Sequence, residues 1–158
     1  MNKEELKKDI REYLGSVIIP DIPCCEDSIT NYDAYNNLDS MYNHNNVESA
    51  NIRLFLDYDI NIDDLANKLG VDSIKLNDMF RFSMIPSKGL TSAICLILNL
   101  SLDDTIIILN KMSYKLGNDD FDKIIRYFFI KDIRDIELLN ETLVSFGCMY
   151  LYSKKKLR

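Results

Sequence analysis

The chain has 158 residues, 47% of them hydrophobic and 28% charged, and its formal net charge is −6. This length and apolar content suit one compact domain, or one domain with an appendage. The acidic balance argues against nonspecific binding to nucleic acid or to an anionic membrane, because both require an excess of Lys and Arg. Glycine and proline are scarce (5 and 3), which favours helices over a turn-rich all-β fold.

The N-terminal segment, residues 1–46, is predicted to be an acidic helix followed by a polar connector. Leu6, Ile10 and Leu14 recur every four residues, which indicates an amphipathic helix over residues 2–14. The glycine and the two prolines of "GSVIIPDIP" are expected to end it. The connector is rich in Asn, Asp, Ser and Tyr and shows no clear period.

The cysteines and the histidine do not predict a metal site or a cofactor. Cys24, Cys25, Cys95 and Cys148 form no C-x-x-C motif, and His44 has no metal-ligand spacing to them. Buried reduced thiols are the simplest interpretation, and a redox pair at 24–25 is the alternative. The charged start "MNKEELKKDI" does not resemble a signal peptide, and apolar runs such as "TIIIL" are too short to span a membrane. We therefore expect a cytoplasmic protein without a membrane partner.

From residue 47 onwards the sequence predicts a series of short helices and no strand, with "SVII" as the one competing segment. Small polar residues mark the expected helix starts, namely Asn61, Asp72, Ser87, Ser101 and Asp135. Gly70 and Gly147 mark two expected helix ends. The most regular amphipathic pattern places five apolar residues on one helix face: Phe121, Ile124, Ile125, Phe128 and Phe129.

The stretch "NIDDLANKLGVDSIKLNDMF" predicts a helix-turn-helix, because two short helices flank Gly70, Val71 and Asp72. Ala66 is small at the point where the two helices would cross closely. The expected inward positions around the second helix are Val71, Leu76 and Phe80.

Residues 47–112 resemble the XRE-type, lambda-repressor/Cro-like helix-turn-helix family. The segment "GVDSIKLNDMFRFSMIPS" has the family's length between Gly70 and Pro86, and "LTSAICLILNLSLDDTIIIL" is similar to the family's fourth and fifth helices. Residues 113–152 resemble the two-helix extension of a clostridial subgroup, in which an acidic segment also precedes the domain. The resemblance implies an all-α fold with a five-helix lambda-repressor-like core, an N-terminal helical arm, two additional C-terminal helices packed on the core and a basic tail at 153–158.

The same resemblance implies a recognition helix that begins at Ser73. The positions that would face bases and flanking phosphates are Ser73, Ile74, Lys75, Asn77, Asp78, Arg81 and Lys88. A solvated helix face is the alternative interpretation of these polar residues. The family's following glycine is Phe82 here, and its basic residues are replaced by Ser83, Met84 and Ile85. Each lost phosphate contact lowers the salt dependence of DNA binding by roughly one unit of slope.

The apolar stretch formed by Phe82, Met84 and Ile85 indicates either a turn folded onto its own core or a patch for a protein partner. The sequence lacks a nucleophile elbow, a phosphate-binding glycine loop and metal-ligand spacing, so we do not expect an enzyme. We predict a non-enzymatic regulatory protein that acts through protein–protein interaction, as an adaptor or inhibitor. A sequence-specific DNA-binding regulator of the XRE/Cro type is the alternative, and a homodimer stays open.

Overall fold

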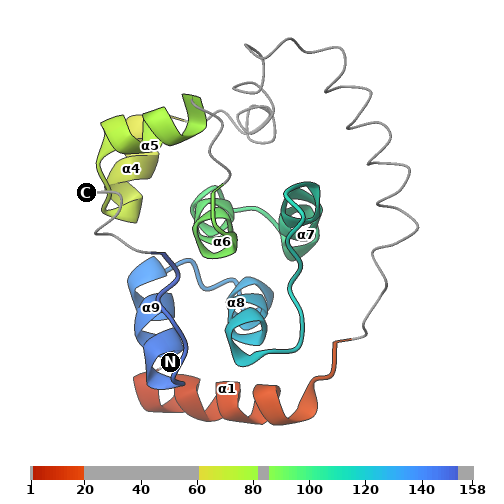
Figure 1. Ribbon diagram of the computed structural model, residues 1–158. Coiled ribbons are helices and arrows are strands. Elements are labelled where there is room, and N and C mark those ends of the chain that lie inside the picture. Colours follow the sequence, from red (N-terminus) through yellow and green to blue (C-terminus); the bar gives the residue numbers. More distant parts are fainter. Residues whose placement is uncertain (1, 20–60, 82–85, 153–158) are drawn as a thin grey trace.

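The computed structural model describes residues 2–19, 61–81 and 86–152, with only the backbone for Phe80 and Arg81. These residues form helices and no strand, so the all-α prediction is confirmed for them (Figure 1). The helices are α1 (Lys3–Ser16), α4 (Ile62–Leu69), α5 (Ser73–Arg81), α6 (Lys88–Ile97), α7 (Leu102–Lys111), α8 (Asp120–Ile130) and α9 (Ile136–Ser145). The predicted first helix of the five-helix core, the connector from residue 20 onwards and the basic tail lie outside the described residues.

Side-chain caps start the helices where the sequence predicts them. The Asn61 side chain accepts a hydrogen bond from the Asp64 amide at 3.2 Å, and the Asp72 carboxylate accepts from two amides at the start of α5. Ser87, Ser101 and Asp135 each cap the following helix in the same way. These bonds satisfy amides that have no partner inside the helix, so short helices gain defined starts.

The N-terminal helix is longer than predicted, because α1 continues through Gly15 to Ser16. The helix thus ends one residue after Gly15 and before Pro20, inside the segment that was predicted to end it. A glycine near a helix end costs at most about 1 kcal/mol, and the packing of α1 on α8 offsets that cost. Asn2 and Glu5 form a reciprocal capping box at the start of α1, which the sequence analysis did not identify.

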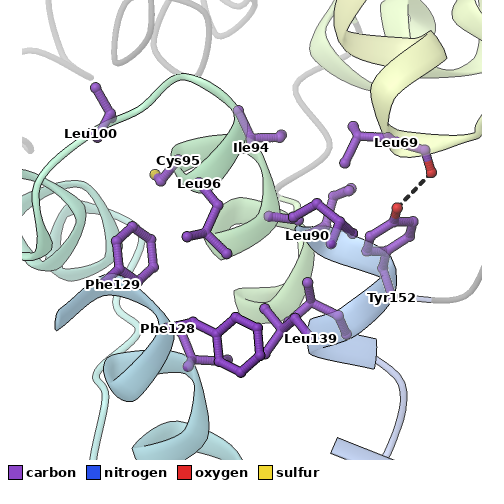
Figure 2. Close-up of a cluster of buried hydrophobic side chains, with 14 of the residues drawn as sticks. Leu69, Leu90, Ile94, Cys95, Leu96, Leu100, Phe128, Phe129, Leu139 and Tyr152 are labelled. Carbon is purple, nitrogen blue, oxygen red and sulfur yellow. Dashed lines mark hydrogen bonds between the residues drawn. The ribbon is translucent and has the colours of Figure 1, made fainter. Parts of the chain in front are cut away.

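Helix α6 lies in the middle of the described helices, with α4 on one side and α7 on the other (Figure 1). Residues 89–96 of α6 are all buried. Helix α8 packs against α1, α7 and α9, and its predicted apolar face is buried except for the partly buried Phe121. Side chains from α1 to the end of the described chain thus form one continuous core, part of which Figure 2 shows.

Helix α1 is anchored to the body by polar contacts as well as by Leu6 and Ile10 in the core. The Lys123 ammonium donates to the Leu14 carbonyl at 3.3 Å, near the C-terminal end of α1. Beyond the helix, the Asn118 side-chain amide bonds both the amide and the carbonyl of Ile19, each at 2.7 Å. The N-terminal helix is therefore an integral part of the packed structure.

The last described residues return to the centre of the molecule, and we call Cys148–Tyr152 the C-terminal strap. The Leu151 amide donates to the Asn140 side chain of α9 at 2.9 Å. The Tyr152 hydroxyl donates to the Leu69 carbonyl of α4 at 2.5 Å (Figure 2). Leu151 and Tyr152 are both buried, so the strap joins α9 to α4 through the core.

The Cys95 thiol should make the free energy of unfolding depend measurably on pH. Burial in α6 raises the pKa of its thiol from 9.0 to about 12. The folded state favours the neutral thiol, so this contribution to stability is complete below pH 9 and is lost as pH rises towards 12. Urea titrations at about pH 8 and about pH 10.5 give the fall in unfolding free energy between the two pH values. This fall should be smaller in Cys95→Ala than in the unmodified chain, by up to about 1.4 kcal/mol per pH unit. Equal slopes would contradict this.

Candidate binding surface

Five of the six sequence-predicted contact residues whose side chains the structure describes lie along α5, on its outer side or at the edge of that side. We call Ser73, Ile74, Lys75, Asn77 and Asp78 the α5 surface. The opposite side of the helix packs inward, with Leu76 fully buried and Met79 7% exposed. At 100° per residue, Ile74 falls near the middle of the outward arc, and its side chain is 70% exposed. The α5 surface is thus a polar face with an exposed isoleucine in its first turn.

The turn before α5 aims this surface. Gly70 ends α4 in the left-handed conformation, with φ at 68°, and Val71 is buried beneath the turn. Asp72 then caps α5, with distances of 2.8 Å to the Ile74 amide and 3.1 Å to the Lys75 amide. Val71 and Leu76 are therefore confirmed as inward residues, whereas the Phe80 side chain lies outside the described part. Met79 is an inward residue that the sequence analysis did not name.

Negative charge predominates around the α5 surface. Among the described side chains of residues 61–79 there are four aspartates and two lysines. One of these lysines, Lys68, forms an ion pair with Asp64 at 3.2 Å, on the surface of α4. The local charge therefore does not favour a polyanionic ligand.

Lys88, which the sequence analysis placed among the phosphate contacts, is engaged within the fold. Its ammonium lies 2.6 Å from the Asp122 carboxylate, whose side chain is only 4% exposed. It also donates to the Lys115 carbonyl at 3.3 Å and lies over the Phe121 ring. The other Asp122 oxygen accepts from the Gly117 amide at 2.7 Å. Lys88 thus joins α6 to α8, and we leave it out of the α5 surface.

The remaining predicted site residues lie outside the described side chains. Arg81 is the last residue of α5, and only its backbone is described. The protein-interaction patch predicted at Phe82, Met84 and Ile85 falls entirely outside the described residues. These positions stay predictions from the sequence.

An open groove of about 420 Å³ lies beside the end of α4. Its lining comes from α4, α6 and the start of α9: Lys68, Leu96, Ile97, Asn99, Arg134, Asp135, Ile136 and Glu137. Its two cationic side chains have carboxylate neighbours, since Lys68 pairs with Asp64 and Arg134 pairs with Asp132 at 2.7 Å. Arg134 also donates to the Leu100 carbonyl at 2.9 Å. The groove therefore has no convergent charge that would define a ligand.

Neither metal-binding nor membrane-spanning features occur in the described ranges. No group of three His, Cys, Asp or Glu side chains there is placed to hold a metal ion. None of the described helices has the length and apolar character needed to cross a bilayer.

No protein-family model, curated protein or solved structure matches this chain.

Proposed function

We propose that this chain is a non-catalytic regulatory protein that binds a protein partner through the α5 surface. The supporting observation is the exposed Ile74 in the first turn of α5, flanked by polar side chains and a net excess of aspartate. An exposed apolar side chain inside a polar rim suits a protein interface, where apolar anchors supply most of the binding energy. We propose an adaptor or inhibitor role, with α4 and α5 as the helix-turn-helix of a divergent XRE-like domain.

Sequence-specific DNA binding is the second candidate. Two short helices joined by Gly70, Val71 and Asp72, with Ser73 and Asn77 on the outer face of the second, suit insertion into a major groove. The charge argues against it. Lys75 is the one described cation on the α5 surface, and Lys88 is paired with Asp122. DNA-binding affinity depends heavily on the number of phosphates that the protein neutralises. A surface with this few cations would therefore bind DNA weakly at physiological salt.

Binding to a random-sequence duplex separates the two candidates. Fluorescence anisotropy of a labelled duplex, titrated with the full chain at about 50 mM and about 200 mM salt, reports both affinity and salt dependence. We expect no saturable binding at either salt concentration. Tight binding that weakens steeply with salt would overturn the protein-partner proposal in favour of the DNA-binding regulator.

The partner proposal makes a prediction for Ile74→Asp. A photo-crosslinking amino acid at Asn77 should give one discrete adduct in cells, whose protein can be identified and purified. Ile74→Asp should then weaken binding of that purified protein by at least about tenfold, because it replaces the exposed apolar anchor of this surface with a charge. Thermal unfolding should not change, since Ile74 is 70% exposed.

Ile107→Asp is the matched control for this prediction. Ile107 is also an exposed isoleucine, 53% accessible, but it lies on α7. The Ile107→Asp variant should bind the partner as tightly as the unmodified chain does. Equal losses in the two variants, or no loss in Ile74→Asp, would show that the α5 surface is not the interface.

A further inference from the structure

The α4–α5 pair is attached to the rest of the described structure mainly through α4. Helix α5 packs chiefly on α4, and α4 in turn packs on α6. Ala66 and Leu69, on the inner side of α4, are both buried. The position of the α5 surface therefore depends on how α4 is held against the body.

The C-terminal strap supplies a second attachment at the end of α4. Leu69 is the last residue of α4, and its carbonyl is one of the terminal carbonyls that have no partner inside the helix. The Tyr152 hydroxyl bonds this carbonyl from a buried position (Figure 2). Helix α5 begins only four residues later, at Ser73. The bond at Leu69 thus lies directly beside the turn that sets the orientation of α5.

The strap itself is held at its far end and open along its middle. The Leu151 amide is bound by Asn140, and Leu151 and Tyr152 are buried. Met149 and Tyr150, immediately before them, are 79% and 67% exposed. A binding partner or a protease therefore has access to the strap next to its two buried anchor residues.

We propose that the C-terminal strap is a latch that regulates the α5 surface. When Tyr152 is docked on Leu69, α4 and α5 are held in one position on the body, and the α5 surface is presented for binding. When the strap is released, the α4–α5 pair keeps its packing on α6 but loses this second attachment, so it opens from the body more readily. The regulatory meaning of the latch rests on the function proposed above, whereas its mechanical coupling does not.

Hydrogen exchange of the full chain, followed by mass spectrometry, tests the coupling. In Tyr152→Ala, amides of α4 and α5 should exchange at least about tenfold faster, because local opening of that unit becomes easier. Amides of α8 should keep their protection. Tyr150→Ala removes the neighbouring, exposed tyrosine and should exchange like the unmodified chain. Unchanged protection of α4 and α5 in Tyr152→Ala would overturn the latch.

Tyr152→Phe decides the outcome if the alanine variant unfolds as a whole. It keeps the buried ring and removes only the hydroxyl that bonds Leu69. A rise in exchange confined to α4 and α5 is expected, smaller than that in Tyr152→Ala. No rise, or an equal rise in α8, would overturn the latch. The exchange measurement needs no partner, so absence of a crosslink at Asn77 would refute the proposed function without affecting this result.

Discussion

Gly89→Ala should lower the free energy of unfolding by about 3 kcal/mol, although alanine is normally the better helix former by about 1 kcal/mol. A Cβ added at Gly89 would lie 1.7 Å from the Leu151 carbonyl oxygen and 2.7 Å from its carbon. Both are backbone atoms, so no side-chain rotation relieves the clash. The strap would have to leave α6, which would expose Leu151 and Tyr152 and break their bonds to Asn140 and Leu69.

Urea unfolding of Gly89→Ala and Gly15→Ala measures this effect against a matched substitution. Gly15 is also helical, but a Cβ there would meet no atom within 4 Å. The Gly15 variant should be as stable as the unmodified chain, or more stable by up to about 1 kcal/mol. If Gly89→Ala is equally stable, the strap does not cross α6 at this point, and the latch loses its structural basis.

The sequence was a good guide to local structure because the signals for helix starts are themselves local. Asn61, Asp72 and Asp135 each bond an amide two or three residues further along the chain. A cap of this kind is visible as a polar residue before an apolar period, whatever the rest of the chain does. The last turn of α1 is harder to place, because it is held by Tyr127 and Lys123 of α8, which lie far away in the sequence.

The contacts that join distant segments were not predictable in this way. Asn118 bonds the backbone of Ile19 across 99 positions of the chain, and Tyr152 bonds Leu69 across 83. Neither asparagine nor tyrosine is distinctive at these positions in the sequence. Gly89 likewise has nothing distinctive in the sequence, and its importance follows only from the close approach of the strap to α6.

The α5 surface was partly predictable, for a related reason. Helical periodicity and the turn at Gly70 together place Leu76 inside and Ile74 outside, which the structure bears out. Lys88 was different, because its role depends on Asp122, a buried carboxylate in another helix. A lysine near a recognition helix looks like a phosphate ligand when its partner is unknown. Assigning basic residues to DNA from sequence alone therefore overestimates the available charge.

Lys88→Met should lower the free energy of unfolding by about 3 kcal/mol, because it leaves the Asp122 carboxylate buried without its cation. The Asp122 side chain is 4% exposed, so water cannot replace the lost partner fully. The Gly117 amide still donates to it at 2.7 Å, which supplies one hydrogen bond but no charge. Urea unfolding, with Lys75→Met as a control, measures the loss. Lys75 is exposed on α5, and its replacement should change stability by no more than about 0.5 kcal/mol.

A second substitution at Asp122 tests whether the buried charge is the cause of that loss. Asp122→Asn removes the charge and keeps an oxygen that can accept from the Gly117 amide. The double variant with Lys88→Met should therefore be less destabilised than the sum of the two single variants, by about 1 to 2 kcal/mol. Strict additivity would mean that the ion pair contributes nothing of its own. In that case any loss in Lys88→Met would come from its contacts with the Lys115 carbonyl and the Phe121 ring.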